Sequence, residues 1–172
     1  MGVSQISAPD QIYHWQARSN FLPLMTAGQK PFFLDDAKTL EALKQPDFDG
    51  SKIVFLPPEA KMLVSVTNET SARVTNVRFG NQYVDADIVA DEPSLVVVSQ
   101  TYYHDWRAFV DGHRTPLLRA NHAFQAIQVP AGTHQIRLSY QDRTFKTGAA
   151  VSIAAWLGCL ICLFRLPPVK VR

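Results

Sequence analysis

The side chains best suited to chemistry in this sequence gather in two short stretches between residues 102 and 124. The first is an unbroken run of aromatic and polar residues: Tyr102, Tyr103, His104, Asp105 and Trp106. The second contains Asn121, His122 and Phe124, which we expect to lie near the first across a β-sheet. Aromatic rings stack on the C–H faces of sugars while amides and carboxylates fix hydroxyls, so the two stretches predict a glycan-contact surface.

A structural interpretation of the same residues competes with the binding one. Trp106 and Phe124 would then fill a hydrophobic core, while Asn121 and Asp111 would hold tight turns. The two interpretations differ in what replacing Trp106 with alanine should do. If Trp106 is a core residue, its replacement should lower the folding stability by roughly 3–5 kcal/mol. If it is a platform for a sugar, the variant should stay folded and lose only ligand binding. The sequence favours the core.

Patterns for catalysis, cofactors and metals do not emerge from the sequence. The histidines at 104, 113, 122 and 134 match no ligand spacing that has a mechanism, and Ser99 and Ser139 lack a nucleophile motif. Cys159 and Cys162 lie in an apolar run without a second ligand pair or a preceding redox strand. We therefore assign no catalytic, cofactor-binding or metal residue, and the residues leave open whether the protein is an enzyme.

Composition and charge exclude other classes of protein. The 47% share of hydrophobic residues is too high for a disordered chain. Of 17 basic residues, five follow the last acid, Asp142, so the preceding 142 residues carry 12 basic and 15 acidic side chains. A nucleic-acid binder should present a basic face there, and we expect no nucleic-acid partner.

Residues 148–164 form a run of seventeen uncharged residues between Lys146 and Arg165. As a helix it would span roughly 25 Å, and the flanking cations can extend it toward a bilayer core of about 30 Å. We predict a transmembrane helix followed by a basic tail at 165–172; the alternative is a buried helix of a globular protein. Three basic residues on either side leave its orientation undecided.

Small residues recur every fourth position in this helix, at Ala150, Ala154 and Gly158. Positions four apart share one stripe, and small side chains let a second helix approach closely. We expect the stripe to pack against neighbouring membrane helices, unless it is an accident of an alanine-rich composition.

The remaining sequence predicts a mainly β protein. Residues 1–30 lack periodicity and suggest an irregular connecting segment, whereas 31–58 suggest a small β-α-β unit with Asp35 as helix N-cap. Residues 59–145 predict an antiparallel β-sandwich of about seven strands. Its strands are expected near 72–79, 84–88, 95–98, 106–110, 114–120, 124–129 and 134–140, with a further strand suggested at 62–66.

Four ordered motifs in residues 95–148 carry a family resemblance. They are WRAFVDG (106–112), ANHAF (120–124), PAGTH (130–134) and TFKTG (144–148). This stretch closely resembles the C-terminal end of the YfhO-type bacterial membrane protein family, and the unit at 31–58 resembles the preceding region more weakly. The sequence departs from the family at residues 103–106, where YHDW stands in place of Tyr-Pro-Gly-Trp.

The resemblance implies a polytopic membrane protein similar to glycosyltransferases that take sugar from a polyprenyl phosphate carrier. Its catalytic carboxylate would lie in an early loop that matches no residue here. The chain would then be a non-catalytic C-terminal fragment, with its sandwich outside the cytoplasm and its tail inside. The expected partners are the bilayer, neighbouring membrane helices and a glycan or polyprenyl-linked sugar. The alternative is a freestanding, membrane-anchored carbohydrate-binding or adhesion module.

Overall fold

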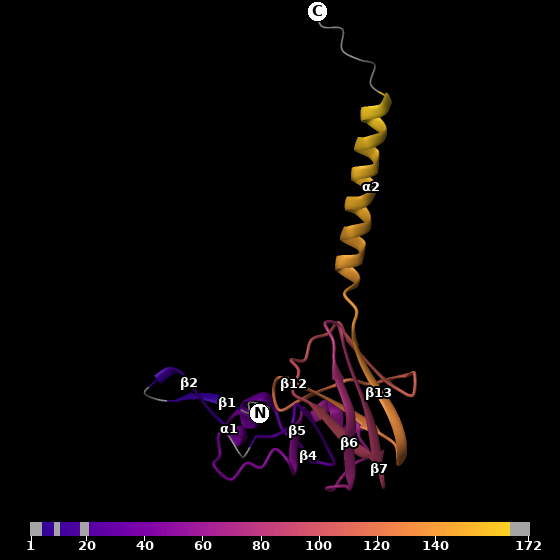
Figure 1. Cartoon of the computed structure of the whole chain (residues 1–172). Helices are drawn as coiled ribbons and strands as arrows, with labels where there is room; N and C mark the ends of the chain where they lie inside the picture. Colours follow the sequence, from indigo (N-terminus) through magenta and orange to yellow (C-terminus); the bar gives the residue numbers. More distant parts are fainter. Residues whose placement is uncertain (1–4, 9–10, 18–20, 166–172) are drawn as a thin grey trace, which may run out of the picture. The chain divides into compact units, whose positions relative to one another are not determined.

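The computed structural model describes residues 5–8, 11–17 and 21–165. The chain divides into two compact units, residues 1–140 and 141–172. The first contains the strands and one short helix, and the second contains the long helix α2 (Arg143–Arg165). The expected antiparallel β-sandwich, small parallel β-α-β unit and long apolar helix are confirmed (Figure 1).

Two antiparallel sheets make up the sandwich. The five-stranded sheet has the order β10-β9-β13-β7-β6, with β6 (Ala72–Phe79), β7 (Tyr83–Ala90), β9 (Trp106–Val110), β10 (His113–Thr115) and β13 (Gly132–Tyr140). The four-stranded sheet has the order β11-β12-β8-β3, with β3 (Met25–Ala27), β8 (Ser94–Val98), β11 (Leu118–Ala120) and β12 (Phe124–Val129). The edge strands β10 and β11 follow each other in the chain, so the chain crosses between sheets there.

Alternating side chains place the core between the sheets. In β7, Val84, Ala86 and Ile88 are buried, and their strand neighbours point to the opposite face. Strand β8 is buried on both faces: Val96 and Val98 pack between the sheets, while Leu95 and Val97 pack against a second apolar cluster. The unbroken apolar run from Leu95 to Val98 therefore marks the central layer of the fold.

The second cluster joins the β-α-β unit to the outer face of the four-stranded sheet. Strands β4 (Lys30–Phe33) and β5 (Ile53–Leu56) pair in parallel, and helix α1 (Asp36–Leu43) connects them along the chain. The Asp35 side chain accepts a hydrogen bond from the Lys38 N–H at 2.9 Å, which makes Asp35 the predicted N-cap. Val54 and Leu56 of β5 are buried against Leu95 and Val97, so this unit and the sandwich share a core.

The structure differs from the sequence analysis in three places. Within residues 1–30, it contains β1 (Gln5–Ala8), β2 (Gln11–Ala17) and β3; these strands are short or lack apolar alternation, so they gave no periodic signal. Residues 114–120 form two strands in different sheets, because Pro116 cannot donate to a ladder. Residues 58–62 form a 3-10 helix, η1 (Pro58–Met62), and the described residues 62–66 contain no strand.

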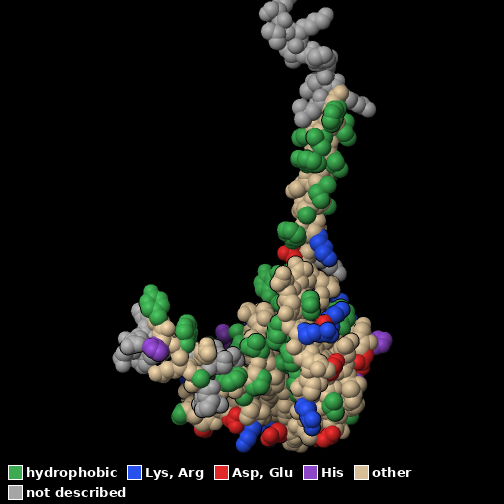
Figure 2. Space-filling view, viewed as in Figure 1, with side chains coloured by type: hydrophobic (Ala, Val, Ile, Leu, Met, Phe, Trp, Pro, Cys, Tyr) green, Lys and Arg blue, Asp and Glu red, His purple; other side chains and the backbone are tan. Residues whose placement is uncertain are grey.

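Helix α2 has the length and composition of a membrane span from Thr144 to Cys162. None of this window is buried, unlike the core helix of a globular protein, and hydrophobic side chains are spread along its length in Figure 2. Asp142 caps the helix by accepting a hydrogen bond from the Phe145 N–H at 2.8 Å. Cys159 and Cys162 are free thiols on this apolar surface. The expected basic tail lies beyond Arg165, outside the described residues.

Candidate functional site

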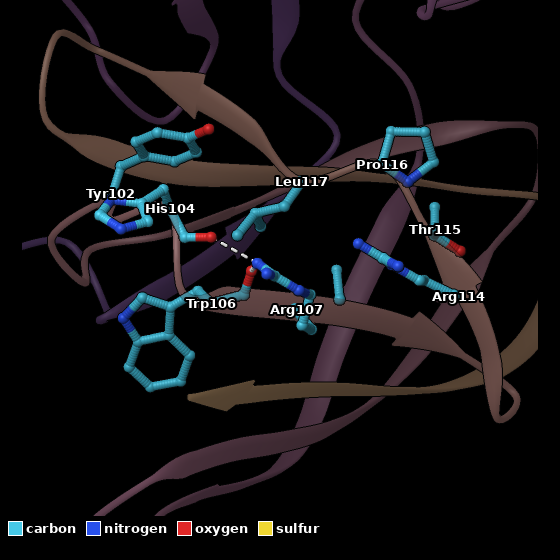
Figure 3. Close-up of a pocket in the computed structure, with 9 residues that line it drawn as sticks. Tyr102, His104, Trp106, Arg107, Arg114, Thr115, Pro116 and Leu117 are labelled. Atoms are coloured by element: carbon cyan, nitrogen blue, oxygen red, sulfur yellow. Dashed lines mark hydrogen bonds between the residues drawn. The ribbon is translucent and has the colours of Figure 1, made fainter. Parts of the chain in front are cut away.

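A cleft of about 390 Å³ opens where the chain crosses twice between the two sheets. The loop 99–105 carries the chain from β8 to β9, and Pro116 and Leu117 carry it from β10 to β11. Both crossings contribute side chains (Figure 3). The lining residues are Tyr102, His104, Trp106, Arg107, Ala108, Arg114, Thr115, Pro116 and Leu117.

Two hydrogen bonds, one to β12 and one to the turn before it, fix the loop that forms one wall of the cleft. The fully buried Gln125 donates from Nε2 to the Thr101 carbonyl at 2.8 Å, and the Tyr102 N–H donates to the Ala123 carbonyl at 2.7 Å. The backbone around Tyr102 is therefore tied to the buried Gln125 of β12 and to the turn between β11 and β12.

The cleft is cationic. Arg107 donates from Nη1 to the carbonyl oxygens of His104 and Trp106, the second at 2.9 Å. Arg114 extends from β10 toward the middle of the cleft (Figure 3), and no ion pair joins it to another described residue. No carboxylate lines the cleft. Two guanidinium groups without acidic partners favour an anionic ligand, because phosphate and carboxylate can accept bidentate hydrogen bonds from arginine.

Trp106 is half-buried and packs against the core between the sheets. Its ring meets the ring of Tyr140 edge to face, with centroids 5.5 Å apart, and points away from Arg107 in Figure 3. Tyr103 is 49% exposed and stacks on Tyr140 at 6.4 Å. Within the aromatic run, Tyr102, His104 and Trp106 therefore line the cleft, and Trp106 also clusters with Tyr103 around Tyr140.

Asp105 also belongs to this run, but it does not line the cleft. Its Oδ2 lies 3.5 Å from Nε2 of His104, and its side chain is mostly buried. Asp105 is thus placed to orient His104 rather than to contact a ligand in the cleft.

Asn121 and His122 lie at a different surface from the cleft. Asn121 hydrogen-bonds the backbone of Phe55 twice, accepting at Oδ1 from its N–H and donating its own N–H to its carbonyl, each at 2.8 Å. Nδ1 of His122 lies 3.5 Å from a carboxylate oxygen of Asp36, which Arg119 also binds at 2.8 Å. These residues dock β5 and α1 onto the β11–β12 turn, and neither lines the cleft.

Sequence reasoning missed the two arginines and the second wall of the cleft. Arg107 lay inside a predicted strand, and Arg114 to Leu117 lay inside another. The sequence feature that could have revealed the second wall is Pro116, because proline interrupts a strand and the chain passes to the other sheet at this point. Asp111, which the structural interpretation expected at a tight turn, forms the hairpin between β9 and β10 together with Gly112. Both residues have positive φ, and the hairpin turns Arg114 back alongside β9.

Two ion pairs outside the cleft hold the five-stranded sheet. Arg137 donates to both oxygens of Asp85 at 2.7 and 2.8 Å, and this hydrogen bonding lowers the pKa of Asp85. His134 contacts Asp111 through Nδ1 at 2.6 Å and the Ala131 carbonyl through Nε2 at 3.1 Å. The Asp111 contact raises the pKa of His134 and lowers that of Asp111. Within the described ranges no group of three or more His, Cys, Asp or Glu side chains is arranged to hold a metal.

Comparison with known proteins gives one family. The family model described as bacterial membrane protein YfhO matches residues 44–152, from the end of α1 into α2. This range covers more than half of the chain and includes all residues of the cleft. No curated protein matches the chain.

Proposed function

The chain belongs to the YfhO family of bacterial membrane proteins, and from that premise we propose that its sandwich is a non-catalytic extracytoplasmic domain anchored by α2. In this proposal the domain serves a larger polytopic membrane protein that transfers sugars to cell-envelope glycans. Its role is to receive a saccharide and hold it near the bilayer. The observation that carries the proposal is the cleft between the sheets, which combines an aromatic wall with two arginines.

The chemistry of the cleft suits a sugar that carries an anionic group. The Tyr102 ring offers a face for the C–H groups of a pyranose, and the Thr115 hydroxyl can exchange hydrogen bonds with sugar hydroxyls. Arg107 and Arg114 supply parallel N–H donors for phosphate oxygens. A polyprenyl-linked sugar has its phosphate directly beside the sugar ring, so one ligand can engage both parts of the cleft.

The absence of a carboxylate from the cleft lining supports a positioning role rather than catalysis. Glycosyl transfer commonly uses a carboxylate as general acid, base or nucleophile, and the two arginines of the cleft stay protonated. In the proposal His104, beside Asp105, binds the ligand rather than moving a proton. In the proposal, the acid–base groups come from another part of the polytopic protein. The sandwich holds the donor or acceptor sugar while they act.

A binding measurement tests the cleft. The full chain in lipid nanodiscs would be titrated with a radiolabelled hexose 1-phosphate, with the free hexose and inorganic phosphate as separate probes. We expect the hexose 1-phosphate to bind more tightly than the free hexose or inorganic phosphate. Arg114→Gln should weaken its binding by roughly 10- to 100-fold, since a hydrogen bond to a charged group contributes about 1.5–3 kcal/mol.

Arg73→Gln is the matched control, because Arg73 is an exposed arginine of β6 that does not line the cleft. It should leave the affinity unchanged. Equal affinity of wild type and the Arg114 variant, or no binding of the hexose 1-phosphate by wild type, would refute the assignment of the cleft.

A further inference from the structure

Aromatic side chains line one end of the five-stranded sheet. Phe79 closes β6, Tyr83 opens β7 and Tyr140 closes β13. Trp106 opens β9, and Tyr103 lies in the loop just before it. The pairing register brings these positions together, because Ser139 pairs with Tyr83 and Tyr140 pairs with Trp106. The row thus crosses four adjacent strands at the same end of the sandwich.

Three residues of this row are open to solvent. Phe79 is 45% exposed, Tyr83 is 43% exposed and Tyr103 is 49% exposed. We call these three residues the aromatic rim. The rings of Trp106 and Tyr140 stand behind it, since Tyr103 stacks on Tyr140 and Tyr140 meets Trp106. Exposed apolar side chains that gather at one place mark interaction sites more often than those scattered singly.

Positive charge accompanies the aromatic rim. The Arg137 guanidinium lies 5.8 Å from the centre of the Tyr83 ring, and Arg107 lies beside Trp106. Asp85 is the acid nearest Tyr83 in the sheet, and its side chain is only 7% exposed and bound by Arg137. The exposed charge next to Tyr83 is therefore cationic, and Asp105 beside Tyr103 is mostly buried, so this part of the rim complements lipid phosphate groups.

The covalent link to α2 leaves from this end of the sandwich. Tyr140 is the last residue of β13, α2 begins at Arg143, and its candidate membrane span begins at Thr144. Three residue steps reach at most about 11 Å. When α2 spans the bilayer, the chain itself keeps the Tyr140 end of β13 close to the membrane surface.

We propose that the aromatic rim docks on the headgroup region of the bilayer that α2 spans, and fixes the sandwich against the membrane. Tyrosine and other amphipathic rings favour this interfacial layer, with the ring among the upper acyl groups and the hydroxyl in the headgroups. The partner is the phospholipid surface itself. The opposite end of the sheet, at the turn formed by Asp91, Glu92 and Pro93, then faces away from the bilayer. This inference does not depend on a ligand in the cleft.

Quenching by headgroup-labelled lipid can test the docking. A fluorophore would be attached to Tyr103→Cys or Glu92→Cys in a full chain whose Cys159 and Cys162 are replaced by alanine. Each protein would be reconstituted in phosphatidylcholine and phosphatidylglycerol vesicles that contain nitroxide on the lipid headgroup. We expect several-fold stronger quenching at residue 103 than at residue 92, because β13 holds the two ends roughly 30 Å apart. Equal quenching at the two sites would overturn the proposal.

A second comparison separates aromatic docking from the effect of the tether alone. Phe79→Ser combined with Tyr83→Ser should lower the quenching at residue 103 several-fold, because the rim no longer holds the domain down. Val89→Ser is the matched control, since Val89 is an equally exposed apolar residue of β7 near the opposite end. Unchanged quenching in the double variant would mean that the rim does not contact lipid, whatever the cleft binds.

Discussion

Trp106 and Tyr140 are cross-strand partners, and their rings meet edge to face with centroids 5.5 Å apart. The pair connects three parts of the molecule, because Trp106 borders the cleft, packs on the core and supports the last residue of β13. Substitutions at either residue should therefore lower the folding stability before they affect any other property.

Replacing Trp106 with alanine should lower the free energy of unfolding by about 2–3 kcal/mol. A fully buried tryptophan would cost roughly 3–5 kcal/mol, and the half-buried position reduces that value. Chemical unfolding of the full chain in detergent, followed by near-ultraviolet circular dichroism, measures the difference. Trp106→Phe should recover most of the loss. A Trp106→Ala protein as stable as wild type would show that the ring serves only a ligand.

Replacing Arg137 with glutamine should lower the free energy of unfolding of the sandwich. The substitution leaves the buried Asp85 carboxylate without its two charged hydrogen bonds, and the exposure of Arg137 keeps the cost below that of a fully buried pair. Adding Asp85→Asn should restore part of the stability, because the uncompensated charge is then gone. Additive losses in the double variant would show that the two residues do not interact.

The contact between His134 and Asp111 should make stability depend on pH. The pKa of His134 is raised above 6.5, so its contribution is complete below 6.5 and is lost as the pH rises through the higher folded-state value. The pKa of Asp111 is lowered below 3.8, so its contribution is lost as the pH falls through the lower folded-state value.

The stabilisation from this pair is therefore greatest between about pH 3.8 and pH 6.5. Melting temperatures recorded across a pH series check this prediction. Wild type should lose more stability than His134→Gln as the pH is raised beyond 6.5. Parallel curves for the two proteins would exclude a protonated His134 as the source of the effect.

The small-residue stripe of α2 should mediate packing between membrane helices. Ala150, Ala154 and Gly158 are exposed along the helix, so they are available to a partner helix. Leucine at Ala154 and Gly158 should weaken association in a two-hybrid assay for membrane helices, because larger side chains keep the backbones apart. Leucine at Val151 and Ile153 is the control and should have little effect. Similar association by both variants would make the stripe an accident of composition.

Local patterns were sufficient to predict most of the fold. The strands expected at 84–88 and 95–98 correspond to β7 and β8, and Asp111 lies at a turn as expected. Each of these features depends on a few neighbouring residues. Strand β3 was missed because three residues are too few for a periodic signal, although its pairing with β8 buries Met25. Propensity along the chain cannot reveal a strand whose stability comes from a distant partner.

The candidate site was only partly predictable for the same reason. Tyr102 and His104 were singled out from their residue types and do line the cleft. Arg114 reaches the cleft only because Pro116 ends β10 and moves the chain to the second sheet. Asn121 was expected to face the same surface, but its two hydrogen bonds to Phe55 place it against β5. These placements depend on the three-dimensional arrangement of the sheets.

The most direct test of an extracytoplasmic, membrane-anchored sandwich is the accessibility of its far end in cells. Glu92→Cys would be introduced into the protein in its native gene context, with Cys159 and Cys162 replaced by alanine. Protoplasts would then be treated with a membrane-impermeant maleimide before and after lysis, and a cysteine added after Arg172 would serve as the cytoplasmic control. We predict that the cysteine at residue 92 is labelled in intact protoplasts and the control only after lysis. Labelling of residue 92 only after lysis would contradict the proposed location.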